Sequence, residues 1–194
     1  MRRGRHRTGA VIASLAIVVS LSGCTTSAGV VPDCAPSDRL VVLMAQSVPS
    51  ATLVPCVGTM PVGWSFTGSS VQNNVAHLWL SSTVAGMNAV EAVFTATCDP
   101  GSAPEVVPAA DEAGARVYEA PDSLDPFRAT RYVVFDGGCV TYRYSFASNV
   151  PATLSLQADD AFSFLPRSDV VRAVRDAFGR TLCGADAPAC PGGT

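Results

Sequence analysis

Cysteine spacing is the feature that most limits how this chain of 194 residues can fold. Six of its seven cysteines lie in the body of the chain: Cys34, Cys56, Cys98, Cys139, Cys183 and Cys190. None forms the closely spaced pair of a zinc site, and His77 is the one histidine outside the first ten residues. We therefore expect no metal site. An even number of cysteines instead predicts a disulfide framework, if the chain reaches an oxidising compartment.

The N-terminus has the pattern of an export signal. Residues 1–8 contain four arginines and no acid, and residues 9–21 are an uncharged, mostly apolar run of 13 residues. A helix needs about 20 apolar residues to span a bilayer, so this run is too short to cross one. A basic start followed by a short apolar run and small residues is typical of a secretory signal peptide.

The end of this segment, Leu21-Ser22-Gly23-Cys24, resembles the lipobox of bacterial lipoproteins. The resemblance covers residues 1–24 and implies cleavage of a signal peptide, 1–23, with diacylglycerol attached to the Cys24 sulfur. Two acyl chains hold a protein stably at a membrane surface. We therefore expect a protein anchored at the extracytoplasmic face of the cell membrane, with residues 24–29 as a tether. No family is identified for the remainder of the chain.

Export makes disulfides the expected state of the six remaining cysteines. Six cysteines allow 15 pairings. Because short loops close most readily, the preferred set is local: Cys34–Cys56, Cys98–Cys139 and Cys183–Cys190.

Charge is distributed unevenly along the chain. All 13 basic residues are arginines, and the loss of four with the leader leaves 9 against 16 acids, a net charge of −7. This balance argues against a nucleic-acid partner. Residues 99–127 hold seven of the acids, five prolines and one base, Arg116. We expect this stretch to be a long surface excursion with a short strand over 116–119.

Apolar residues alternate with polar ones in the middle of the chain, which predicts strands. Runs at 64–67 and 76–81 form a hairpin through the turn residues 72–74, and 90–98 forms a third strand with Cys98 on its core side. A second hairpin joins 132–135 to 140–146 through residues 136–139, in which two glycines permit a tight turn.

Helical spacing is confined to the two ends. A short helix begins at a Ser37 cap and stops at Pro49, although the apolar run 40–45 is also compatible with a buried strand. A second helix runs from Pro151 to Pro166 with Leu154, Ala158 and Phe162 on one face. A third is capped by Ser168, carries Val171, Val174 and Phe178 on one face, and ends at Gly179. The pattern predicts a single α+β domain, residues 30–194, with a mostly antiparallel sheet stapled by disulfides.

Candidate reactive residues are few, and each has a simpler structural interpretation. His77 lies on a strand without the motif of a serine hydrolase. Asp159 and Asp160 point to different sides of a helix, and we expect them on a solvated face. Other candidates are a calcium-binding set of Glu119, Asp122 and Asp125, an anion site at Arg143, and a sugar platform that includes Trp64 and Trp79.

None of these signals is strong, so we predict no catalytic, metal-binding or cofactor-binding residue. The expected function is a noncatalytic binding or protein-interaction module of the cell envelope, held at the membrane through Cys24. Two alternatives remain. A carboxylate-dependent hydrolase of envelope polymers would bring two acids together in a cleft, and a lipid-binding carrier would need a large apolar cavity.

Overall fold

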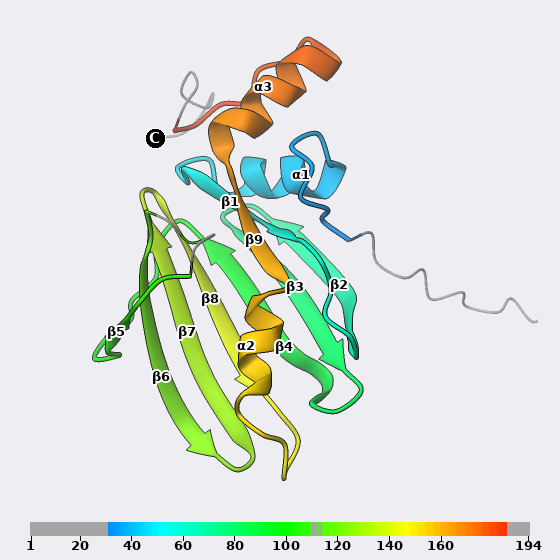
Figure 1. Ribbon diagram of the computed structural model, residues 1–194. Helices are drawn as coiled ribbons and strands as arrows, with labels where there is room; N and C mark the ends of the chain where they lie inside the picture. Colours follow the sequence, from blue (N-terminus) through cyan, green and yellow to red (C-terminus); the bar gives the residue numbers. More distant parts are fainter. Residues whose placement is uncertain (1–30, 110–111, 113, 186–194) are drawn as a thin grey trace, which may run out of the picture.

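A seven-stranded antiparallel sheet forms the centre of the molecule. The computed structural model describes residues 31–109, 112 and 114–185. Its elements follow one another in this order: α1 Arg39–Ser47, β1 Leu53–Val57, β2 Trp64–Gln72, β3 Val75–Ser82, β4 Gly86–Thr95, β5 Glu105–Val106, β6 Arg116–Leu124, β7 Phe127–Phe135, β8 Gly138–Ser145, α2 Leu154–Asp159, β9 Phe162–Pro166 and α3 Arg167–Phe178. The large sheet has the order β2-β3-β4-β8-β7-β6-β5, and β1 pairs with β9 separately (Figure 1). The predicted α+β class is confirmed.

The two faces of the large sheet differ in what covers them. The β1–β9 pair and α2 lie over one face, and α1 packs against its β2–β3 side (Figure 1). Strand β3 shows the alternation that this arrangement requires, since Ala76, Leu78 and Leu80 are buried between the half-exposed His77 and Trp79. The buried residues of the sheet include these: Val90, Phe94, Val117, Val133, Val140, Tyr142 and Tyr144.

Both predicted hairpins are present, and the second is fastened to the α1–β1 connection. The backbone N–H of Thr52 donates to the Asp136 carbonyl at 3.0 Å, and the Ser50 hydroxyl donates to the Gly137 carbonyl at 2.7 Å. Gly137 has φ of +65°, and a Cβ atom there would lie 1.9 Å from the Ser50 carbonyl oxygen. The turn therefore requires glycine at this position for both its conformation and its close contact.

The first helix forms as predicted, but Asp38 is its cap. The Asp38 carboxylate accepts hydrogen bonds from the backbone N–H groups of Leu40 at 2.9 Å and Val41 at 3.1 Å. Ser37, the predicted cap, lies one residue too early to accept these bonds. An acid at this position also interacts favourably with the positive end of the helix dipole.

The second predicted helix is only partly correct. It spans Leu154–Asp159, and the chain then becomes strand β9, in which Phe162 is 2% exposed and pairs with Val57. The i, i+4, i+8 spacing of Leu154, Ala158 and Phe162 is thus divided between two elements. The error arises because hydrogen bonding to β1, more than 100 residues earlier, outweighs a helical pattern within one segment.

The last helix forms as predicted, but its first and last turns each differ from the prediction in one respect. It starts at Arg167, so Ser168 lies inside the helix and makes no capping bond; the residue before the helix is Pro166. Val171 and Val174 are buried, whereas Phe178 is 62% exposed. Gly179 ends the helix at φ 63°, as predicted. In the described part of the chain, no helix has the length and apolar character needed to cross a membrane.

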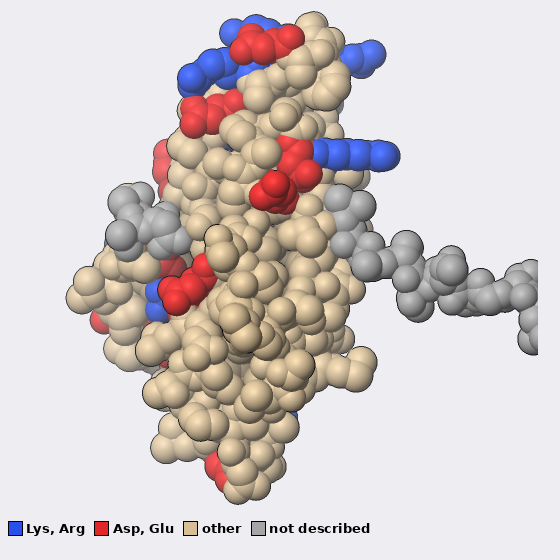
Figure 2. Space-filling model, turned by 45° about the vertical axis from the view of Figure 1, so that its right-hand side comes forward, with Lys and Arg blue, Asp and Glu red and all other residues tan. Residues whose placement is uncertain are grey.

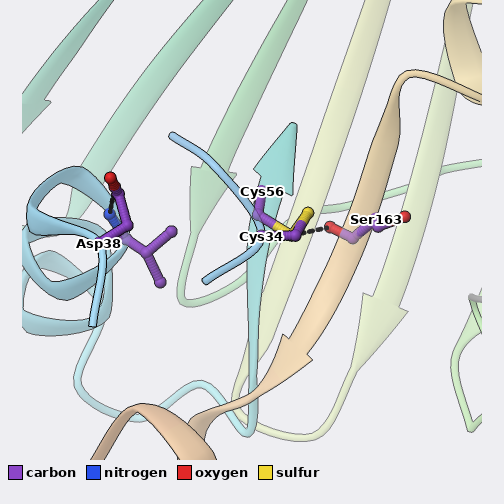
Figure 3. The surroundings of a disulfide bond; sticks show 5 residues. Cys34, Asp38, Cys56 and Ser163 are labelled. Atoms are coloured by element: carbon purple, nitrogen blue, oxygen red, sulfur yellow. Dashed lines mark hydrogen bonds between the residues drawn. A yellow bond between two sulfur atoms is a disulfide. The ribbon is translucent and has the colours of Figure 1, made fainter. Parts of the chain in front are cut away.

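Two of the three predicted disulfides lie within the described residues. Cys34 pairs with Cys56 at a Cα–Cα distance of 5.1 Å, and Cys98 pairs with Cys139 at 5.9 Å. Figure 3 shows the first bridge, in which the Cys56 sulfur lies 3.4 Å from the Ser163 carbonyl oxygen of β9. Cys183 is also disulfide-bonded. Its predicted partner, Cys190, lies outside the described residues, so that pairing stays a prediction.

The Cys98–Cys139 bridge does not lie on the predicted face. Strand β4 ends at Thr95, and Cys139 pairs with Thr95, which lies on the face opposite to that of Phe94. Cys98 comes after the strand, so the alternation that places Val90 and Phe94 in the core no longer applies to it. Cys139 is nevertheless fully buried.

The acidic excursion contains more sheet than expected. Strand β6 covers Arg116–Leu124, well beyond the predicted 116–119, and β5 adds a two-residue edge strand. A register shift between Pro121 and Ser123 allows proline within β6.

Candidate functional site

A large apolar groove runs between α1 and α3. Its volume is about 690 Å³, and it is lined by Ser37, Arg39, Val42, Leu43, Gln46, Val174, Phe178, Arg180, Thr181 and Leu182. We call these residues the α1–α3 groove. Small-molecule sites in proteins are mostly apolar hollows of about 300–1,000 Å³, so the groove has the size and the lining of a binding site.

Helix α1 contributes one wall because it carries apolar residues on two sides. Val41, Met44 and Ala45 face the core and are fully buried. Val42 and Leu43 line the groove, and Leu43 is 41% exposed. A surface helix normally has one apolar stripe. Val42 also packs against the core, so Leu43 is the more exposed apolar residue of this wall.

The other wall comes from α3 and the residues that follow it. Val174 and Phe178 are four residues apart and therefore lie on one side of α3. The left-handed Gly179 then redirects the chain, so that Arg180 and Leu182 also reach the groove. Phe178, predicted to share a face with Val171 and Val174, is exposed in the groove, whereas those two valines are buried.

Positive charge accompanies the apolar lining. Arg39 and Arg180 both line the groove, and no acidic residue is among its lining residues. Within the described parts of the chain, neither arginine forms an ion pair, whereas Arg131, Arg143 and Arg172 each do. Figure 2 shows basic and acidic side chains together at the end of the molecule where α1 and α3 lie.

A second feature is a buried charge cluster centred on Arg131 of β7. Its Nη2 atom donates to both carboxylate oxygens of Glu112, at 3.0 and 2.8 Å, and its Nη1 lies 3.4 Å from Glu119. Its Nε lies 4.0 Å from the carboxylate of Asp159, which accepts a hydrogen bond from the Tyr144 hydroxyl. We call these five residues the Arg131 cluster.

Burial and charge shift the pKa values in the Arg131 cluster. Burial acts against the Arg131 charge, but Asp159 and Glu112 outweigh it and raise the arginine's pKa. Burial raises the pKa of Asp159 to about 6, with Glu119 and Glu112 acting in the same direction and Tyr144 and Arg131 against it. Burial and the neighbouring Asp159 also raise the pKa of Tyr144. Asp159 therefore differs from the solvated residue predicted, whereas Asp160 is exposed.

The raised pKa predicts a pH dependence of stability. Asp159 binds its proton more tightly in the folded than in the unfolded chain, where its pKa is near 3.8. Between pH 3.8 and about 6 the folded state thus holds more protons, and the free energy of unfolding falls as pH rises. In Asp159→Asn, the decrease in the free energy of unfolding over this pH range should be smaller by about 2–3 kcal/mol. Urea denaturation at several pH values across the range measures it. Asp160→Asn is the matched control and should retain the wild-type slope; equal slopes in all three proteins would contradict the assignment.

The space beside the Arg131 cluster is small. A hollow of about 40 Å³ is lined by Ala109, Glu112, Tyr142, Asp159, Asp160, Phe162 and Phe164. Such a volume has room for one or a few water molecules, and it is far below the size of a ligand site. The carboxylates thus converge, but they converge on an arginine rather than on a cleft that could admit a sugar.

Several predicted candidates lie on the sheet face that is turned away from the helices. The His77 and Trp79 rings stack with centroids 5.6 Å apart, and His77 Nδ1 lies 2.9 Å from a Glu91 carboxylate oxygen. Arg143, the candidate anion site, donates to the other Glu91 oxygen at 3.0 Å and so forms a cross-strand ion pair. His77 lies on a strand, as predicted, and its side chain is partly exposed.

The proposed platform and calcium set are not assembled. Trp64 is 7% exposed and packs in the core, so it cannot share a surface with Trp79. Glu119 contacts Arg131, while the Asp125 carboxylate accepts a hydrogen bond from the Asn149 backbone at 2.9 Å. Among the residues that the structure describes, no three potential metal ligands gather at one point.

The sequence contains a signal for the Arg131 cluster in the alternation of β7. Ala129, Arg131, Val133 and Phe135 alternate along β7, so Arg131 occupies a core position of that strand. An arginine at a core position must have acidic partners, and residues 99–127 contain many acids close to it in the sequence. The α1–α3 groove had no comparable signal, because it depends on the packing of two helices that are more than 110 residues apart in the chain.

Comparisons with protein-family models, with curated proteins and with solved structures found no match to this chain.

Proposed function

We propose that the chain is a bacterial lipoprotein, anchored through Cys24 to the extracytoplasmic face of the cell membrane, that acts as a noncatalytic binding module. The anchor is supported by the basic and apolar leader and by the lipobox-like residues 21–24. Disulfides at Cys34–Cys56 and Cys98–Cys139 are typical of exported proteins, which agrees with this location.

The observation that carries the binding role is the α1–α3 groove. Exposed apolar side chains lower solubility unless they serve contact, and Leu43 and Phe178 lie exposed on facing walls of one hollow. The groove also supports the alternative of a lipid-binding carrier, since a volume of about 690 Å³ suits a small apolar ligand.

The hydrolase alternative has less support. Glycoside cleavage needs two acids on either side of a bound sugar bond, one of them ready to give up a proton. The acids of the Arg131 cluster are held by Arg131 beside a hollow of about 40 Å³. Their arrangement favours a structural role for the Arg131 cluster over a catalytic one.

Membrane fractionation of a bacterial host that expresses the full chain tests the anchor. The wild-type protein should sediment with membranes, and Cys24→Ala should be lost from that fraction because it has no acyl chains. Ser22→Ala is the matched control, since it replaces one small lipobox residue with another and should stay in the membrane fraction. Membrane retention of Cys24→Ala at the wild-type level would overturn the proposal.

A further inference from the structure

We infer that the α1–α3 groove binds a single long-chain fatty acid, with its acyl chain along the apolar lining and its carboxylate held by Arg39 or Arg180. This inference rests on the proposed binding function and specifies the ligand class of that site.

The apolar lining defines where the acyl chain lies. Val42 and Leu43 form one wall, Val174 and Phe178 form the other, and Leu182 is buried at 4% exposure. Each methylene group transferred from water to such a surface contributes favourable free energy, so affinity grows with the length of acyl chain that the groove covers. Covering Leu43 and Phe178 should contribute most to binding, because they are the groove's apolar residues with the largest exposed fractions.

The two arginines define the head group. Arg39 is the first residue of α1 and Arg180 follows the end of α3, so they enter the groove from different elements. A guanidinium binds a carboxylate through paired hydrogen bonds. Both arginines lack a carboxylate partner among the described residues, and the mature chain is otherwise acidic. An unmatched pair of cations beside an apolar groove is complementary to an amphiphile with an anionic head.

The polar residues of the lining are compatible with this arrangement. Ser37, Gln46 and Thr181 are neutral, so they can donate hydrogen bonds to a carboxylate without repelling it. The groove is less suited to contact with a bilayer surface. Membrane-binding surfaces present protruding apolar side chains, whereas the apolar residues of the groove line a hollow.

Photo-crosslinking to the full chain on isolated membranes tests the inference. The probe is a long-chain fatty acid that carries a diazirine, and a fatty alcohol with the same chain and diazirine is the comparison. Mass spectrometry should find the fatty acid attached to peptides that contain residues 39–46 and 174–182. Labelling of these peptides by the fatty acid should require about tenfold less probe than labelling by the alcohol.

Two sets of variants separate the chain from the head group. Leu43→Asn with Phe178→Ser should raise the half-saturating concentration of both probes about tenfold, and Val62→Asn is the matched control because Val62 is 100% exposed and outside the groove. Arg39→Gln with Arg180→Gln should weaken binding of the fatty acid to the level of the alcohol. Binding of the alcohol should be unchanged. Unaltered thermal unfolding verifies that each variant is folded.

The outcomes are distinct. Equal labelling by acid and alcohol in the wild type, labelling outside the groove, or groove variants that behave like Val62→Asn would each overturn the inference. If the wild type sediments with membranes but takes up neither probe, the ligand assignment fails while the lipid anchor stands. If Cys24→Ala also sediments with membranes, the anchor fails independently of the groove.

Discussion

Arg131→Met should lower the free energy of unfolding by about 3–5 kcal/mol, because it leaves the buried Glu112 and the partly exposed Glu119 and Asp159 without their counter-ion. The Arg131 side chain is 9% exposed and contacts Glu112, Glu119 and Asp159, and the Glu112 side chain is 7% exposed. Methionine keeps most of the side-chain volume, so the loss reports charge rather than a cavity. Urea denaturation at pH 7 measures it.

The matched control for Arg131 is Arg143, which also pairs with a glutamate across strands. Arg143 is 57% exposed, so Arg143→Met should cost less than about 1 kcal/mol. Adding Glu112→Gln and Asp159→Asn to Arg131→Met should recover part of the loss, since the unpaired charges are then removed. A loss for Arg131→Met as small as that for Arg143→Met would refute the counter-ion role.

Removal of the Cys98–Cys139 disulfide should have a similarly large effect. The bridge closes a loop with a sequence separation of 41 residues, and in the chain-entropy description such a crosslink stabilises the fold by about 4 kcal/mol. Cys98→Ala with Cys139→Ala removes the bond without adding a polar group to the buried Cys139 position. Chemical denaturation of the oxidised wild type and of the double variant gives the difference.

The Cys34–Cys56 bridge is the comparison for this experiment. Its separation of 22 residues predicts about 3 kcal/mol, so both double variants should be destabilised, with the longer loop losing slightly more. Reduction of the wild type breaks both bridges, so the reduced protein should lose more stability than either double variant. A loss below about 1 kcal/mol for Cys98→Ala with Cys139→Ala would contradict the assignment of this bridge as a structural staple.

Local patterns predicted much of the sheet. Leu78 and Leu80 in β3 and Tyr142 and Tyr144 in β8 are buried at the alternate positions expected, because a strand with one covered face shows its burial directly in its sequence. The cysteine pairs Cys34–Cys56 and Cys98–Cys139 were predicted correctly because they are local.

Features that depend on distant partners were not predictable in the same way. Phe162 fits a helical face within its own segment, and only pairing with Val57 makes it part of a strand. Phe178 likewise fits a core face, but at the end of α3 the core no longer reaches it. Arg131 could have been recognised from its position in an alternating strand, whereas the α1–α3 groove could not, since its two walls meet only in the folded chain.

The proposed location at the membrane rests on the lipid anchor at Cys24. Mass spectrometry of the protein purified in detergent from bacterial membranes tests it directly. We expect a chain that begins at Cys24 and carries diacylglycerol on its sulfur. A chain that retains residues 1–23, begins at another residue or has a free Cys24 thiol would contradict it.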